Sequence, residues 1–265
     1  MNPYLSIVIP AYNEAAILPV TLKCLREFLD ERPFTAEVII VDDGSTDNSA
    51  AVLDEWRRSF ENLRVLRNSV NIGKGASIRR GILASRGECI FVSDADLPGR
   101  PEDIVRLLEA LRDGAVVAIA SRRPAPLSSA PSTSRFLAST AYRALVRLIL
   151  NLPLRDTQCG FKAFVREPLV PIAQELRLGG FSFDVEFLYA AWKRGLAIRE
   201  VDFEVVERRP TRYAILLQSP RMLIDLLRIR IFSGRAPRNA RTEGVKIERA
   251  PVEAEPAPTA PDAPR

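Results

Sequence analysis

Residues 88–100 read ECIFVSDADLPGR, and this stretch decides the class of fold. Its apolar run ends at Val92 and has the length of a buried strand. Two carboxylates, Asp94 and Asp96, follow the run with Ala95 between them. Acidic residues at the end of a buried strand are typical of parallel sheets, whose ligands bind outside the carboxyl ends of the strands. A turn is the other interpretation, because Asp before Pro-Gly is common turn chemistry.

The same pattern of apolar runs and helical periodicity extends along most of the chain. The predicted strands are residues 4–9, 37–43, 63–67, 88–94, 115–121 and 197–209. The predicted helices are residues 14–31, 47–60, 75–85, 101–113, 135–152, 183–195 and 220–231. Strands that alternate with helices predict an α/β fold in which a mostly parallel central sheet is flanked by helices on both faces.

The composition restricts the chemistry. The 265 residues include no histidine, which excludes His-dependent triads, His-ligated zinc and a His general base. Any metal is therefore expected on carboxylates, which favours Mg²⁺ or Mn²⁺ over zinc. The three cysteines are far apart and lack metal-ligand spacing. We expect reduced thiols and a cytoplasmic location.

The C-terminal segment differs from the rest of the chain. Residues 233–265 are rich in proline and nearly lack large apolar side chains, which predicts a disordered tail after a single domain of residues 1–232. No apolar run is long enough for a transmembrane helix, and no signal peptide is expected.

Polar residues also follow the first two predicted strands. Tyr12 and Glu14 come after the first, where a capped helix start is the plainer interpretation. Asp42 and Asp43 end the second. Their carboxylates can accept hydrogen bonds from a nucleobase or ribose, although a strand-ending turn explains them as well.

The segment NIGKGASIRRG, residues 71–81, invites comparison with phosphate-binding loops. It lacks the Ser or Thr that the Walker pattern requires and the last glycine of the dinucleotide fingerprint, which disfavours a P-loop ATPase and a Rossmann dehydrogenase. Lys74 at the start of the predicted helix can still lie near a diphosphate.

Two arginines flank a long Pro/Ser-rich loop. Arg122 ends a predicted strand, Arg135 begins the next helix, and residues 123–134 between them have the length of a functional loop or lid. Solvated cations are the plain interpretation. Together the two side chains would suit a phosphorylated acceptor.

Four of these segments, taken in order, resemble a known family. SIVIPAYNE, VIIVDDGSTD, NIGKGASIRRG and FVSDADL are similar to the nucleotide-sugar half of the inverting family 2 glycosyltransferases of the GT-A fold. SRR, DTQCGFKAF and FDVEFLYAA narrow the resemblance to the polyprenyl-phosphate glycosyltransferases, and most closely to the dolichyl-phosphate β-glucosyltransferases. The similarity covers about residues 4–232, so the predicted domain would be the catalytic one.

The resemblance implies a donor side and an acceptor side. Asp94 and Asp96 match the family's DxD motif, which would hold Mg²⁺ or Mn²⁺ on the diphosphate of the donor. Asp96 would also take part in catalysis. Arg122 and Arg135 would bind the phosphate of the acceptor, and Asp184 is the candidate acceptor-side carboxylate. The residues expected around the donor nucleotide are Pro10, Tyr12, Glu14, Asp42, Asp43, Lys74, Asp94 and Ala95.

The resemblance also implies an acceptor-side place for Glu186, which lies in the same predicted helix as Asp184. If the acceptor is a lipid phosphate, it is already ionised at neutral pH and needs positioning more than a base. If the acceptor is a hydroxyl, a carboxylate such as Asp184 must take its proton.

The expected function is an inverting, metal-dependent transfer of a hexose, glucose favoured, to polyprenyl or dolichyl phosphate. UDP-glucose is the favoured donor and GDP-mannose the other candidate; no nucleic-acid partner is expected. The enzyme is expected to be peripheral at the cytosolic, inner face of a membrane, touching it through the basic amphipathic helices 135–150 and 213–231. Packing of both helices on the core is the alternative.

Two other functions stay open. The first is a soluble family 2 glycosyltransferase that acts on a sugar or a small hydroxyl acceptor. The second is a nucleotide-sugar-binding regulator without catalysis, against which the intact pair of Asp94 and Asp96 argues. The segment QSPRM, residues 218–222, has Met in place of the Trp of the processive QxxRW motif, so transfer of a single sugar is expected.

Overall fold

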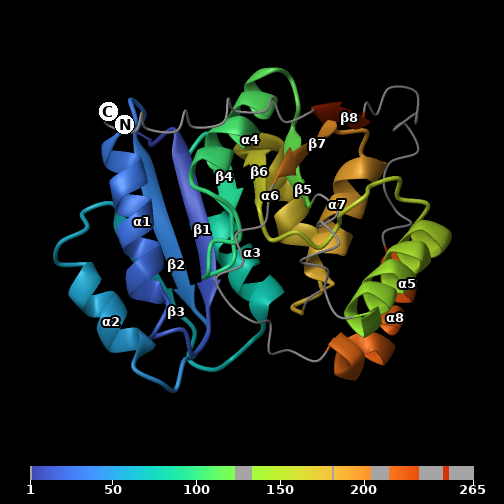
Figure 1. The fold of residues 1–265 in the computed structure, drawn as a ribbon, viewed down its shortest axis with the longest axis horizontal. Helices are drawn as coiled ribbons and strands as arrows, with labels where there is room; N and C mark the ends of the chain where they lie inside the picture. The colour runs from blue at the N-terminus through green and yellow to red at the C-terminus, as the bar shows by residue number, and fades with distance from the viewer. Residues whose placement is uncertain (1, 123–132, 181, 204–214, 233–246, 251–265) are drawn as a thin grey trace, which may run out of the picture.

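A sheet of eight strands organises the computed structural model, which describes residues 2–122, 133–180, 182–203, 215–232 and 247–250 (Figure 1). The strands are β1 (Leu5–Ala11), β2 (Ala36–Asp42), β3 (Leu63–Arg67), β4 (Cys89–Val92), β5 (Val117–Arg122), β6 (Lys162–Val165), β7 (Ile198–Phe203) and β8 (Ile247–Ala250). The helices are α1 (Leu18–Asp30), α2 (Ser49–Trp56), α3 (Lys74–Ala84), α4 (Glu102–Arg112), α5 (Thr133–Leu150), α6 (Arg166–Glu175), α7 (Phe183–Lys193) and α8 (Ile215–Phe232).

The strand order across the sheet is β3-β2-β1-β4-β6-β5-β7-β8. Neighbouring strands run parallel except at β6, which is antiparallel to both β4 and β5. The prediction of a mostly parallel sheet is therefore confirmed. It places the carboxyl ends of β1, β2 and β4 at one edge, where their polar loops meet.

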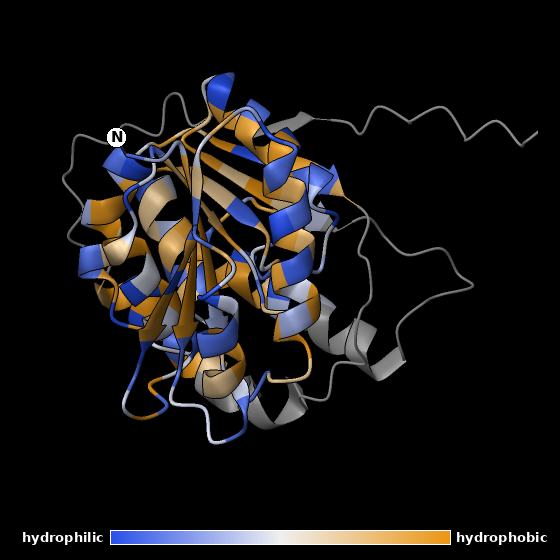
Figure 2. Cartoon of the chain, turned by 90° about the vertical axis from the view of Figure 1, so that its left-hand side faces the viewer, coloured by the Kyte–Doolittle hydropathy of each residue, from blue (hydrophilic) through white to orange (hydrophobic). Residues whose placement is uncertain are grey.

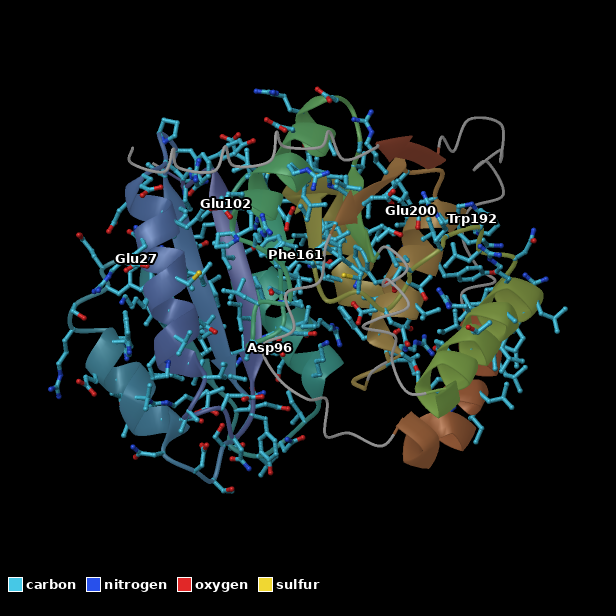
Figure 3. The ribbon with its side chains drawn as sticks, in the orientation of Figure 1. Glu27, Asp96, Glu102, Phe161, Trp192 and Glu200 are labelled. Atoms are coloured by element: carbon cyan, nitrogen blue, oxygen red, sulfur yellow. The ribbon has the colours of Figure 1, made fainter. Side chains whose placement is uncertain are left out.

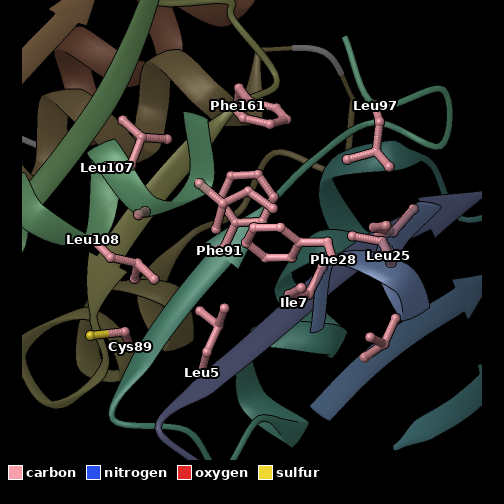
Figure 4. Close-up of a cluster of buried hydrophobic side chains, with 14 of the residues drawn as sticks. Leu5, Ile7, Leu25, Phe28, Cys89, Phe91, Leu97, Leu107, Leu108 and Phe161 are labelled. Carbon is pink, nitrogen blue, oxygen red and sulfur yellow. The ribbon is translucent and has the colours of Figure 1, made fainter. Parts of the chain in front are cut away.

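Alternating side chains bury both faces of the sheet, as the period of two in a strand requires. Ile7 and Ile9 of β1 face the layer of α1, α2 and α4, whereas Val8 faces α3 and α7. On the first side, Phe91 of β4 meets Phe161 edge to face at 4.6 Å between ring centroids (Figure 4). Hydrophobic residues accordingly concentrate along the strands and the inner sides of the helices (Figure 2).

The first helix begins later than the periodicity predicts. The backbone N–H groups of Glu14 and Ala15 donate to the side chains of Ser49, the first residue of α2, and of Asp47 in the loop before it. Helix α1 therefore begins at Leu18. Helix α2 is also shorter than predicted, ending at Trp56.

Several elements were not predicted. Strand β6 is only four residues long and contains a lysine, and α6 carries Pro171 in its interior. Four residues of the predicted disordered tail, Ile247–Ala250, instead form β8 beside β7, so β7 is not the last strand. The rest of residues 233–265 and the end of the strand predicted at 197–209 lie outside the described residues. The division into domain and tail stays a prediction.

Candidate active site

The loops after β1 and β2 are joined by hydrogen bonds. Asn13, with φ at 55°, accepts a hydrogen bond from the backbone N–H of Thr46 at 2.8 Å through its side-chain oxygen. Its own backbone N–H donates to the hydroxyl of Ser45 at 3.0 Å. This network fixes the loop that carries Tyr12, which is exposed, next to the buried end of β2. The predicted nucleoside-binding residues Pro10, Tyr12, Glu14 and Asp42 thus share one edge of the sheet, and their contact with a donor stays a prediction.

Asp42 and Asp43 lie in different surroundings. Asp42 accepts a hydrogen bond from the backbone N–H of Ser45 at 3.0 Å. Asp43 accepts one from Ile72 at 3.0 Å through Oδ1 and one from Gly73 at 2.9 Å through Oδ2. Both oxygens of Asp43 therefore hold the loop before α3 in place. Its contact with the donor stays a prediction, and in the structure its carboxylate supports the loop before α3.

The N-terminus of α3 is occupied by the protein itself. The backbone N–H groups of Gly75 and Ala76 donate to the carbonyl of Gly179, at 2.8 and 3.2 Å. Gly73 has φ at 100°, and a Cβ atom there would lie 2.5 Å from the same carbonyl oxygen. Since these groups are already satisfied, a backbone cradle for phosphate is not available at this turn. The side chain of Lys74 is the part of the motif that can reach a ligand.

Lys74 and Asp94 form the central ion pair of the site. The Nζ atom of Lys74 lies 2.5 Å from Oδ1 of Asp94. Burial alone would lower the pKa of the Lys74 ammonium, but the carboxylates of Asp94 and Asp184 outweigh it and raise the pKa above its usual value. Lys74 is therefore a cation at neutral pH. The structure brings together two residues that the sequence places twenty positions apart.

The backbone between the two predicted metal ligands is held by residues on either side. Thr21 of α1 donates its hydroxyl to the carbonyl of Ala95 at 2.5 Å, and both residues are buried. The backbone N–H of Leu97 donates to the carbonyl of Asp94 at 3.1 Å and closes a turn. Asp96 lies in this turn, at the carboxyl-terminal edge of the sheet (Figure 3). Thr21 has a supporting task here that sequence reasoning missed.

The two carboxylates suit a hard divalent cation. Oxygen atoms are the ligands that Mg²⁺ prefers, and it usually takes one or two carboxylates together with phosphate and water. The ammonium of Lys74 is a stand-in cation at Asp94 and shows that this position attracts positive charge. Among the described residues no group of three or more acidic or cysteine side chains could hold a metal by itself. The other ligands would come from a bound diphosphate and water.

Gly160 shapes the position of Asp94. A Cβ atom at residue 160 would lie 2.4 Å from Oδ2 and 3.0 Å from Oδ1 of Asp94, closer than atoms can approach without a shift. The carboxylate therefore lies between the Lys74 ammonium and bare backbone. The segment DTQCGFKAF contributes to the resemblance, but sequence reasoning gave Gly160 no task.

We expect Gly160→Ala to lower the rate of the expected hexose transfer by about tenfold to a hundredfold. A displacement of about 1 Å at a reacting centre has an effect of that size. The added methyl group must push the carboxylate of Asp94 aside. Steady-state rates measure the effect, and Gly180→Ala is the matched control because its Cβ would meet nothing within 4 Å. Equal rates for both variants would contradict this account of Gly160.

Asp184, the predicted acceptor-side carboxylate, forms a buried ion pair. Its Oδ1 atom lies 2.7 Å from Nζ of Lys162, which also donates to the carbonyl of Cys159. Lys162 is 2% exposed and Asp184 7%. Asp184 is therefore a poorly accessible carboxylate with a fixed cationic partner. Lys162 is a second residue that sequence reasoning missed, since nothing in a short strand indicates its partner.

Glu186, two residues further on in α7, supports the loop before that helix. Its carboxylate accepts hydrogen bonds from the backbone N–H groups of Arg177 and Leu178, the latter at 2.9 Å. Burial raises the pKa of Glu186, and these backbone donors offset only part of the effect. Glu186 is engaged away from Asp184, so the structure does not bring the two carboxylates together as a pair.

The predicted acceptor arginines are placed by their backbone. Arg122 is the last residue of β5, and Arg135 lies in the first turn of α5. Their part in binding an acceptor phosphate stays a prediction. The expected lid, residues 123–134, lies outside the described residues up to position 132.

Helices α5 and α8 pack against each other and present apolar side chains outward. On α8, Met222, Leu226 and Ile229 are buried against the domain. Ile224 and Ile231, in contrast, are 50% and 70% exposed. The exposed residues of the two helices, together called the α5–α8 surface below, include Arg143, Arg147, Leu148, Leu223, Ile224, Leu227, Arg228, Arg230, Ile231 and Phe232. No helix in the described part of the chain has the length and apolar character needed to cross a membrane.

Comparisons with known proteins show the family of the chain. The model of the family "Glycosyl transferase family 2" matches residues 6–171. The chain is 35% identical over 243 residues to a dolichyl-phosphate beta-glucosyltransferase of Dictyostelium discoideum, covering 86% of this chain and 74% of the relative. It is 34% identical over 242 residues to the enzyme of that name from Homo sapiens, covering 86% and 75%.

Solved structures show the same fold. Glucosyl-3-phosphoglycerate synthase from Mycobacterium tuberculosis, in complex with Mn²⁺, UDP and glucosyl-3-phosphoglycerate, superposes with a TM-score of 0.64 at 21% identity. The match covers 89% of this chain and 82% of the synthase. With a GT-A sheet, a pair of carboxylates at its edge and a family model over most of the chain, this protein belongs to glycosyltransferase family 2.

Proposed function

We propose that this enzyme transfers glucose from UDP-glucose to dolichyl or another polyprenyl phosphate, with inversion at the anomeric carbon. The observation that carries the proposal is the ion pair of Lys74 and Asp94 at the end of β4. It sits in a chain about a third identical to dolichyl-phosphate beta-glucosyltransferases over most of both lengths. The site offers carboxylates for a divalent cation and an ammonium for a diphosphate.

The donor side of the site would compensate the negative charge of the diphosphate with a divalent cation and a lysine. Asp94 and Asp96 would hold Mg²⁺ or Mn²⁺, which offsets the charge that develops on the leaving nucleoside diphosphate. Lys74 adds a second positive charge from the side of α3. Thr21 and Gly160 keep the backbone and carboxylate of this turn in position, so little reorganisation is needed when the donor binds.

The acceptor side favours a phosphate over a hydroxyl. A phosphate monoester is already ionised at neutral pH, so its oxygen can attack the anomeric carbon without a base. The new bond forms between that oxygen and the anomeric carbon while the bond to the diphosphate breaks on the opposite face. Asp184, the candidate base for a hydroxyl, is buried and paired with Lys162. We infer that it serves as a positioning residue, and that Arg122 and Arg135 bind the acceptor phosphate.

A lipid acceptor requires access to a membrane, and the α5–α8 surface supports it. Its exposed apolar residues are flanked by arginines, an arrangement that suits the boundary between anionic headgroups and acyl chains. We propose that this surface rests on the cytosolic face of a membrane, where nucleotide sugars are supplied. Cys24, Cys89 and Cys159 are thiols rather than disulfides, in keeping with that compartment.

Radiolabelled UDP-glucose offered together with polyprenyl phosphate and Mn²⁺ tests the proposal. We expect label in the lipid phase and none without metal. GDP-mannose, UDP-galactose and UDP-N-acetylglucosamine serve as competing donors. Label in a soluble glycoside with none in lipid would favour the soluble transferase, and binding of UDP-glucose without any turnover would favour a regulator.

We expect replacing both Ile224 and Ile231 with Asp to weaken binding to anionic vesicles by about tenfold or more, since each buried apolar side chain contributes about 1.5–3 kcal/mol. Sedimentation with phosphatidylcholine vesicles that contain phosphatidylglycerol measures the effect. Val20→Asp is the control, because Val20 is 52% exposed on α1, away from this surface. Wild-type binding by the double variant would exclude the α5–α8 surface as the membrane contact.

A further inference from the structure

We propose that Lys74 is a built-in counter-ion of the metal site, which occupies Asp94 before the donor arrives and moves to the diphosphate when metal and donor bind. The inference rests on the proposed metal site at Asp94 and Asp96. It makes metal binding and donor binding depend on one side chain, and it predicts opposite effects on the two affinities when Lys74 is lost.

The geometry supports competition for Asp94. The ammonium lies 2.5 Å from Oδ1, which is the kind of oxygen that a divalent cation would take as a ligand. Oδ2 faces Gly160, whose missing Cβ leaves just enough room for the carboxylate. A metal ion that takes Oδ1 as a ligand therefore competes with the ammonium of Lys74 for the same oxygen.

The surroundings favour a cation at this place even without a metal ion. Asp184 lies near enough to Lys74 to act on its charge, together with Asp94. Lys162 cannot take the place of Lys74, because its Nζ is bound to Asp184 and to the carbonyl of Cys159. Lys74 sits at the first position of α3, where only its own side chain has to rotate. It is thus the one residue in this ion-pair cluster that is placed to exchange Asp94 for a ligand.

A diphosphate gives the displaced ammonium a new partner. Charge-assisted hydrogen bonds from lysine to phosphate are as favourable as those to carboxylate. Without donor, a metal ion weakens the pair of Lys74 and Asp94 and leaves the ammonium beside a second cation. With donor, the ammonium moves to the phosphate oxygens. Donor and metal therefore strengthen each other's binding by the same factor, as linkage requires.

Removing the charge at residue 74 separates these effects. We expect Lys74→Met to bind Mn²⁺ about tenfold more tightly than the wild type in the absence of nucleotide, within the usual range of coupling between sites. We expect its affinity for UDP, measured with Mn²⁺ present, to fall by a similar factor. Titration of the electron paramagnetic resonance signal of free Mn²⁺ gives the first affinity, and calorimetry with UDP gives the second.

Matched variants at residues 74 and 23 serve as controls. Lys74→Gln repeats the neutralisation if the Met variant folds poorly, and Lys74→Arg keeps the charge and should bind Mn²⁺ as the wild type does. Lys23→Met removes the same charge from an exposed pair with Glu27 on α1 and should change neither affinity. Equal Mn²⁺ affinity in the wild type and both neutral variants would overturn the proposal.

The same titration separates this inference from the proposed function. If Asp94→Asn abolishes Mn²⁺ binding and Lys74→Met leaves it unchanged, the metal site is right and the counter-ion role is wrong. If Mn²⁺ binds equally well after Asp94 and Asp96 are both replaced, the metal assignment itself fails. Tighter Mn²⁺ binding by Lys74→Met with weaker UDP binding is the joint signature that a merely structural lysine would not produce.

Discussion

Asp94→Asn should lower the rate of glucose transfer by about a hundredfold to a thousandfold, the usual cost of removing one preorganised electrostatic contact from a transition state. Asn keeps the size of the side chain but not its negative charge, so it no longer holds a divalent cation or pairs with Lys74 at 2.5 Å. Initial rates at saturating Mn²⁺ with labelled UDP-glucose measure the loss.

The control for this variant is Asp54→Asn, which removes a carboxylate of α2 from an exposed ion pair with Arg67 of β3. A surface pair of this kind contributes about 0–1 kcal/mol to stability, so transfer should be unaffected. The thermal midpoint of the control should stay near that of the wild type. An Asp94→Asn enzyme that retains half of its activity, still metal-dependent, would show that the carboxylate is not a metal ligand.

Lys162→Met should lower the free energy of unfolding by about 3–5 kcal/mol, because it leaves the carboxylate of Asp184 buried without its cation. The Nζ atom of Lys162 is 2.7 Å from Oδ1 of Asp184, and the lysine is 2% exposed. Met fills a similar volume, so the loss comes from the charge rather than from a cavity. Denaturant unfolding followed by circular dichroism gives the difference.

A second replacement identifies the cause. In the double variant with Asp184→Asn no charge is left unpaired, and most of the lost stability should return. Asp184→Asn alone should be strongly destabilising, because it leaves the ammonium of Lys162 without its carboxylate. If the double variant is as unstable as the sum of the two single ones, the pair does not act as a unit.

The parallel half of the fold was predictable because its strands are buried on both faces. Such strands read as continuous apolar runs, and the polar residues after them mark the carboxyl ends. Asp42, Lys74, Asp94 and Asp96 could be placed at one edge of the sheet for that reason, and the family resemblance gave them roles. The structure adds which of them contact one another.

The missed features depend on contacts between distant segments. Lys162 is the first residue of β6, and its partner Asp184 is 22 residues away in another element. Both oxygens of Asp43 are used by a loop whose path is set by Gly73 and the carbonyl of Gly179. Strand β8 forms because the edge of β7 offers unpaired backbone groups, not because its own residues favour a strand.

The antiparallel strand β6 also has a consequence for synthesis of the chain. In the sheet it lies between β4 and β5, yet residues 162–165 follow both in the sequence. A nascent chain that has reached the end of β5 therefore has two strand edges waiting for a partner that has not yet emerged from the ribosome. Exposed edges invite pairing with the wrong partner. The most vulnerable interval in the synthesis of this enzyme is thus the translation of the 39 residues between Arg122 and Lys162, after which β6 can pair with both of these edges.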